Sequence, residues 1–203
     1  MSSQINYQWV EIYKLISDEL VAFYEKHKDN AGRELYKKCM SKEYRKDFIR
    51  VNPWIEKFEN IWRVHSIDPV HLFASFNSWK ITPEAKKAKL RLYYKILTEK
   101  DFIELEKTDL DVFKYFPHIQ ITRVVGARSD TDQELIWKFF IQIMKNKVDE
   151  TLYDTILGYK YQKKVYGIGF PVLTIFMFWI NSDQYLPLDR NTRSILNKKN
   201  ERT

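Results

Sequence analysis

The sequence predicts a mainly α-helical bundle, folded as one lobe or two, and three observations lead to this prediction. Apolar side chains recur at helical spacing along most of the chain. Cap-type residues followed closely by proline mark several helix starts. The 203 residues are 44% hydrophobic and 16% aromatic, enough to bury a sizeable core. No internal repeat or linker divides residues 1–203, so we expect a single domain.

The first half of the chain predicts helices one after another. Apolar residues at helical spacing predict a helix from Trp9 to Tyr24, ended by the turn-forming stretch 26–32. A second helix is predicted over residues 33–49, and Pro53 marks the start of a third.

Helix starts in the second half are marked by caps. Ser66 or Asp68 precedes Pro69, and Thr82 precedes Pro83. Either Ser129 or Thr131 caps a strongly apolar helix, whereas residues 117–128 are the best candidate for extended structure.

Composition limits the classes of function. Thirty-four Lys and Arg against 27 Asp and Glu give a net charge of +7, a moderate bias toward polyanionic partners. A single cysteine, Cys39, excludes an intramolecular disulfide and a cysteine-rich zinc site, and it suits the cytoplasm. The longest apolar run, residues 170–180, is well short of the roughly 20 residues of a membrane span. We therefore expect a cytoplasmic protein with no membrane partner.

The stretch YGIGFPVLTIFMFWI, residues 166–180, predicts a short helix, a tight turn and a second helix. Gly167 and Gly169 allow backbone conformations that other residues avoid, and Pro171 suits a first helical turn. Exposed N–H groups at such a helix start form an anion site that fits a phosphate.

Residues 163–196 resemble the helix-hairpin-helix element of the DNA glycosylase superfamily, in which a catalytic aspartate follows the second helix. Asp189 stands 20 residues after Gly169, as the resemblance requires. Pro171 occupies the position of the nucleophilic lysine of the bifunctional enzymes, which disfavours a lyase mechanism. The alternative is that the turn only joins two helices and that Asp189 only caps the helix beginning near Asn191.

Four blocks in order along residues 9–196 resemble the N-terminal region of McrB-like AAA+ proteins of modification-dependent restriction systems. The blocks include IDPVHLFASFNSWKITPEAKKAKLRLYYKIL and YGIGFPVLTIFMFWINSDQYLPLDRNTRSIL. The resemblance implies a module that binds modified double-stranded DNA, with an AAA+ motor in the same longer chain and a separate nuclease subunit. This chain has no phosphate loop of the type that a nucleotide-driven motor needs.

Reading a modified base by flipping it out of the duplex requires aromatic walls, a polar group and phosphate contacts. The candidates for the base pocket are Phe76, Asn77, Trp79, Trp179 and Asp189, and those for the DNA backbone are Gly167, Ile168, Gly169, Lys163, Lys164, Arg190 and Arg193. Core packing is the commoner role of residues such as Phe76 and Trp179, and a helix cap is an equal alternative for Asn77.

The other charged and reactive residues give weaker evidence of a functional site. Lys86, Lys87, Lys89 and Arg91 form a second basic patch, although a solvated helix face is the commoner explanation. Arg128 lies among cap-type residues, which favours a structural role. The four histidines show no metal-ligand spacing, so we expect neither a metal nor a cofactor.

Three functions follow, in this order. The first is a non-enzymatic reader of modified DNA that targets a restriction or defence complex. The second is a monofunctional DNA glycosylase in which Asp189 activates water or stabilises charge. The third is a protein-interaction domain whose turn is only structural.

Overall fold

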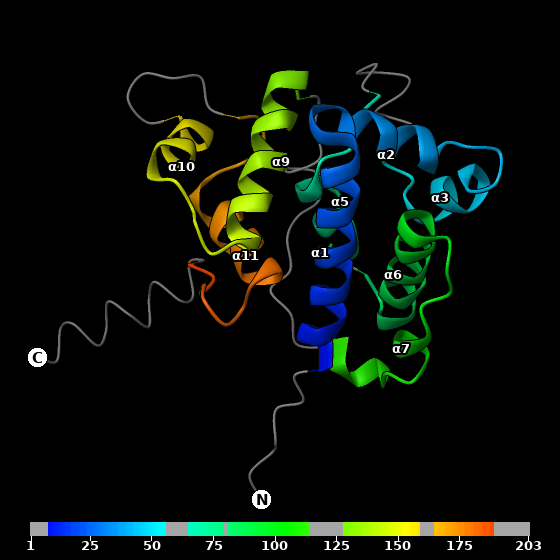
Figure 1. Cartoon of the computed structure of the whole chain (residues 1–203). Helices are drawn as coiled ribbons and strands as arrows, with labels where there is room; N and C mark the ends of the chain where they lie inside the picture. Colours follow the sequence, from blue (N-terminus) through cyan, green and yellow to red (C-terminus); the bar gives the residue numbers. More distant parts are fainter. Residues whose placement is uncertain (1–7, 56–64, 79–80, 114–127, 159–164, 189–203) are drawn as a thin grey trace, which may run out of the picture.

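The computed structural model describes residues 8–55, 65–78, 81–113, 128–158 and 165–188. These ranges form helices and the turns between them, which confirms the predicted mainly α-helical bundle (Figure 1). The elements are α1 (Gln8–His27), η1 (Lys28–Asn30), α2 (Ala31–Cys39), α3 (Arg45–Val51), α5 (Pro69–Phe76), α6 (Pro83–Thr98), α7 (Ile103–Glu106), η3 (Leu110–Phe113), α9 (Asp130–Met144), α10 (Glu150–Leu157) and α11 (Phe170–Ile180). The extended structure expected at 117–128 lies outside these ranges, apart from Arg128.

Three helices begin where local capping chemistry predicts. The Asp68 carboxylate accepts a hydrogen bond from His71 N (2.9 Å) at the start of α5. Thr82 and Ser129 accept equivalent bonds at the starts of α6 and α9. Each bond satisfies a backbone N–H that has no partner within the helix.

The prediction of a single helix over residues 33–49 is wrong. α2 ends at Cys39, and Ser41 O accepts hydrogen bonds from Tyr44 N (3.2 Å) and Arg45 N (2.9 Å). The chain therefore turns before α3 begins, while Tyr44 and Phe48 still reach the core as expected. Apolar spacing predicted which residues are buried, but it did not reveal the turn between them.

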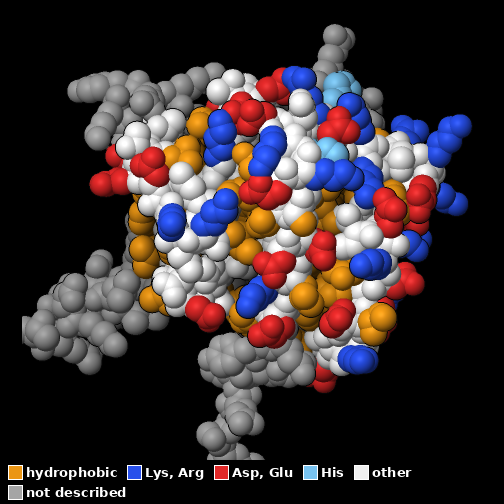
Figure 2. All heavy atoms as spheres, viewed as in Figure 1, with side chains coloured by type: hydrophobic (Ala, Val, Ile, Leu, Met, Phe, Trp, Pro, Cys, Tyr) orange, Lys and Arg blue, Asp and Glu red, His pale blue; other side chains and the backbone are white. Residues whose placement is uncertain are grey.

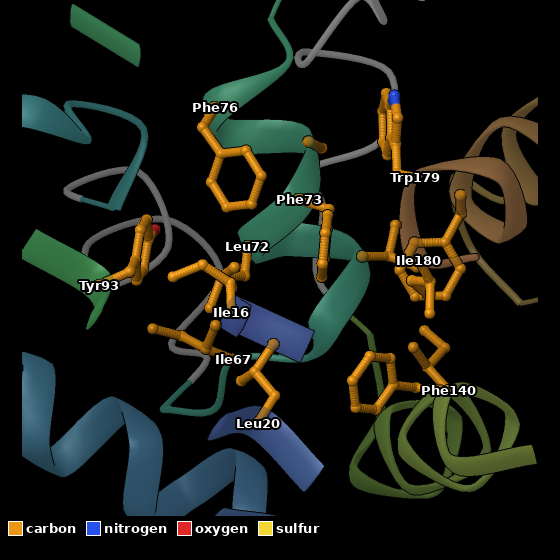
Figure 3. Close-up of a cluster of buried hydrophobic side chains, with 14 of the residues drawn as sticks. Ile16, Leu20, Ile67, Leu72, Phe73, Phe76, Tyr93, Phe140, Trp179 and Ile180 are labelled. Atoms are coloured by element: carbon orange, nitrogen blue, oxygen red, sulfur yellow. The ribbon is translucent and has the colours of Figure 1, made fainter. Parts of the chain in front are cut away.

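α5 is the central helix of the bundle, and all eight of its residues are buried. α6, α9 and α11 pack against it, and Tyr13 of α1 contacts its aromatic rings. Figure 3 shows side chains of α5 between those of α1, α6, α9 and α11. Because burying one large apolar side chain contributes about 1.5–3 kcal/mol, this cluster is the main source of stability.

Among the described helices α11 is the most apolar, and its length matches the expected core helix. Within the described ranges, no helix combines the length and apolar character that crossing a bilayer requires.

Candidate nucleic-acid interface

The turn before α11 has the backbone geometry that the glycines predict. Gly167 has φ 74°, a left-handed conformation that costs residues with a Cβ roughly 1–2 kcal/mol. Ile168 is buried beneath the turn and anchors it. Gly169 is the N-cap of α11 and supplies no side-chain hydrogen bond, and Pro171 lies in the first turn of the helix. The N-cap residue of α11 therefore supplies no side-chain cap, and helix starts with a glycine N-cap can bind an anion.

Arg128 braces this turn from inside the protein. Its Nε donates a hydrogen bond to Tyr166 O (3.0 Å), and its Nη1 donates to Asp68 Oδ2 (2.7 Å). The same Nη1 contacts His71 Nε2. The side chains of Asp68 and Arg128 are fully buried, so this ion pair is desolvated on both sides. The expected structural role of Arg128 is confirmed.

The pairing of Arg128 with Asp68 is the feature that sequence reasoning missed. Asp68 was expected as a helix cap, and Arg128 stands beside the Ser129 cap, but 60 positions separate the two. The signal in the sequence was weak: charged residues, Asp68 and Arg128 among them, stand at the starts of two helices.

The chain returns to the same end of α11 after the helix. Leu188 N donates a hydrogen bond to Thr174 Oγ1 (3.0 Å), and Thr174 Oγ1 donates to Pro171 O (3.2 Å). Asp189, Arg190 and Arg193 follow Leu188 and lie outside the described residues, as do Lys163 and Lys164 before the turn. The roles expected for these five residues stay predictions.

The helix-hairpin-helix arrangement is not confirmed. α10 ends at Leu157, and Val165 N donates to Ile156 O (3.2 Å), so the chain returns to α10 before the turn begins. Residues 159–164, which precede Val165, are outside the described ranges. The second helix and the turn are as expected, but in the described chain the first helix does not reach the turn.

Three of the expected base-pocket residues lie in the interior. Phe76 is fully buried and Trp179 is 1% exposed. Asn77 Oδ1 accepts hydrogen bonds from Tyr13 Oη (2.7 Å) and Lys86 Nζ (3.1 Å). These residues have packing and hydrogen-bonding partners in the core, and contact with a base stays a prediction. Trp79 is outside the described residues.

The prediction of a second basic patch on the surface is wrong for two of its four residues. Lys86 is 1% exposed and Lys89 is 8% exposed, because they lie on the side of α6 that faces α5. Lys89 Nζ donates to Ser75 O (2.8 Å). Burial lowers the pKa of Lys86 to about 7 and that of Lys89 to about 8. Both amines are therefore core groups and cannot contact phosphates.

The described part of the chain was also searched for a metal site and a reactive cysteine. No group of three or more His, Cys, Asp or Glu side chains within it is arranged to hold a metal ion. Cys39 is buried, and burial raises the pKa of its thiol, which makes it a poor nucleophile.

Comparison with known proteins identifies one family. A family model described as a domain of unknown function, DUF8425, matches residues 9–201. No curated protein and no solved structure was found to match.

Proposed function

The chain belongs to the DUF8425 family, and from the geometry of its own turn we propose that it is a DNA-binding specificity domain. It recognises a modified base and targets a restriction or defence complex in the cytoplasm. The observation that carries the proposal is the braced turn: Gly167 with positive φ, Gly169 as the N-cap of α11, and Arg128 holding Tyr166 O from below.

The braced turn is suited to a DNA phosphate. Backbone N–H groups at a helix start and the helix dipole both favour negative charge. The net charge of +7 attracts a polyanion over longer distances. On the face that Figure 2 shows, positive and negative side chains are interspersed, so we assign the phosphate contact to the turn rather than to a broad basic patch on that face.

An aromatic side chain lies directly beside the turn. Tyr166 is 55% exposed, which is unusual in a chain that buries most of its described large aromatics. An exposed ring next to a phosphate site can stack on an unpaired or flipped base. In the proposed complex, phosphate contacts position the DNA, whereas base contacts distinguish modified from plain duplexes. The AAA+ motor and the nuclease subunit are the partners that such a domain would serve.

The proposal is tested with matched duplexes carrying plain, 5-methylated, 5-hydroxymethylated and N6-methylated bases at one fixed salt concentration. Two variants isolate the turn. Gly169→Asp and Gly169→Asn both suit the extended N-cap backbone (φ −102°, ψ 170°), but only aspartate adds a negative charge. We expect the aspartate variant to bind every duplex about tenfold more weakly than the asparagine variant, because the carboxylate repels phosphate.

The outcomes separate the candidate functions. Preference of the wild type for one modified duplex supports a reader of modified DNA. Equal affinities of the two variants would show that the turn does not contact the DNA. Absence of binding to all duplexes would overturn DNA recognition and leave a protein-interaction domain.

One contact favours the glycosylase as the second candidate. The Leu188 to Thr174 hydrogen bond returns the chain to the start of α11 immediately before Asp189. In an enzyme, Asp189 would activate water or stabilise charge. Abasic sites that accumulate with the wild type, and not with Asp189→Asn, would make the domain an enzyme.

A further inference from the structure

The corner between α2 and α3 concentrates positive charge. Residues 33–50, which cover most of α2, the turn after it and α3, carry seven Lys and Arg against three Asp and Glu. The other described residues carry 14 Lys and Arg against 20 Asp and Glu. In Figure 2, Lys and Arg side chains project from the edge of the molecule where Figure 1 places α3. The corner is therefore the positive region of a described chain that is otherwise acidic.

Three neighbouring cations of this corner have no carboxylate partner among the described residues. Lys42, Arg45 and Lys46 are exposed, and no ion pair joins them to the described chain. Arg50, about one turn farther along α3, pairs with Asp47 (2.9 Å). Three unpaired positive charges within five residues repel one another, and an external anion would relieve that repulsion.

The buried side of α3 determines that these cations face solvent. Tyr44 is 5% exposed, and Phe48 is fully buried with its ring centroid 5.8 Å from that of Tyr93 in α6. Ser41 O accepts the hydrogen bonds from Tyr44 N and Arg45 N that close the turn before α3. Because the aromatic residues hold α3 against the core, the charges are presented from a fixed backbone, which lowers the entropic cost of binding.

The pattern of charges suits an acidic peptide better than DNA. Two exposed carboxylates, Glu43 and Asp47, lie among the cations. Duplex DNA has one charge about every 1.7 Å along its axis, so its phosphates would meet these carboxylates. Residues of an extended peptide are about 3.3 Å apart, and its acidic side chains can be confined to the positions that face cations. Figure 1 also shows α3 and α11 on opposite sides of α1, so the corner is separate from the braced turn.

We propose that the α2–α3 corner binds a carboxylate-rich segment of a partner protein through Lys42, Arg45 and Lys46. Each of these cations pairs with one Asp or Glu of the segment, whereas Glu43 and Asp47 disfavour a continuous polyanion. Exposed ion pairs are individually weak and are screened by salt, so the contact contributes orientation and a faster encounter more than tight binding. The proposal does not depend on DNA binding at the braced turn.

The test is a fluorescence anisotropy titration of a fluorescein-labelled peptide of alternating Glu and Ser residues with the full chain. The control probe is the same peptide with Gln in place of every Glu. We expect saturable binding of the acidic peptide, which weakens as the salt concentration rises, and no binding of the control probe.

Two triple variants separate the corner from the net charge of the chain. The corner variant replaces all three cations of the corner with glutamine, and we expect it to bind the acidic peptide about tenfold more weakly, because three ion pairs are lost. The control variant removes the same number of charges at exposed positions that lie far apart in the sequence: Lys14→Gln, Lys107→Gln and Lys147→Gln. Its affinity for the peptide should stay within about twofold of the wild type.

Equal losses in the two variants would show that only the net charge matters and would overturn the proposal. Absence of saturable binding of the acidic peptide would overturn it as well. The two variants should bind the DNA duplexes equally. A corner variant that binds DNA more weakly than the control variant, with its affinity for the peptide unchanged, would make the corner a nucleic-acid surface instead.

Discussion

Lys86 in α6 and Arg128 at the start of α9 show two different ways of burying a cation. Lys86 is 1% exposed and donates to the neutral oxygen of Asn77 (3.1 Å). Arg128 is 3% exposed and donates to the carboxylate of Asp68 (2.7 Å). The lysine lies in the aromatic core, beside the Phe113 ring, whereas the arginine lies under a turn that it holds in place.

The difference follows from the chemistry of the two side chains. An ammonium group can lose its proton when it is desolvated, and burial lowers the pKa of Lys86 to about 7. A guanidinium group stays charged in proteins, so a buried arginine requires an anion. We therefore expect the stability of the core around α6 to depend on pH above neutrality, and the cluster beneath the turn to depend on an intact ion pair.

The largest effect is expected from breaking the ion pair. Arg128→Met leaves the Asp68 carboxylate buried without its cation and removes the bond to Tyr166 O. We expect the free energy of unfolding to fall by about 3–5 kcal/mol, as measured by urea denaturation.

Arg33→Met is the control for that substitution, since Arg33 pairs with Asp130 at the exposed surface. Its effect should stay within about 1 kcal/mol. A loss of the same small size for Arg128→Met would show that the buried pair does not need its cation, and the comparison with Lys86 would fail.

A pH-dependent effect is expected from Lys86→Met. The unfolded lysine has a pKa of 10.5 and the folded one a pKa of about 7, so the unfolded state binds more protons between these values. The stability of the wild type should therefore rise from pH 7 toward pH 10.5, and Lys86 should contribute up to about 1.4 kcal/mol per pH unit. The stability that Lys86 contributes is complete above pH 10.5 and is lost progressively as the pH falls to 7.

Methionine does not titrate, and Asn77 Oδ1 keeps the hydrogen bond from Tyr13. The variant should therefore show a shallower pH dependence, with its greatest gain over the wild type at pH 6. Urea denaturation at pH 6, 7, 8 and 9 measures both curves, and Lys89, whose pKa is about 8, contributes to the slope that remains. Parallel curves would mean that Lys86 keeps its proton in the core.

The smallest effect is expected from Arg91, a cation on the exposed side of the same helix. Arg91 pairs with Glu106, and both side chains are about half exposed, at 49% and 51%. Arg91→Gln should change the free energy of unfolding by less than about 1 kcal/mol, with the pH dependence unchanged. A larger loss would mean that surface pairing on α6 matters as much as burial.

Much of the local structure was predictable from the chain. Thr82 before Pro83, and Ser129 or Thr131 before the apolar run, predict helix starts, because capping bonds join residues that are close in sequence. In the structure, Thr82 and Ser129 accept the capping bonds. The turn at Gly167 was predictable for a similar reason, since the conformation is permitted by the residue itself. For the candidate site, the sequence correctly indicated the turn and the start of α11.

The rest required knowledge of which helices touch. In sequence, Lys86 and Lys89 look like the solvated face of a helix, and only the packing of α6 against α5 makes them core residues. At Phe76 and Trp179 the sequence does not distinguish an aromatic of a pocket wall from one of the core, and the structure shows that both side chains are buried.

The sequence by itself determined the helical class, the capped helix starts and the glycine turn, because these depend on neighbours within a few residues. The tertiary structure alone decided that Arg128 pairs with Asp68, 60 positions away, and that Lys86 and Lys89 are buried. The physical reason is that desolvation and long-range pairing depend on the surroundings of a side chain, which exist only once the helices have packed.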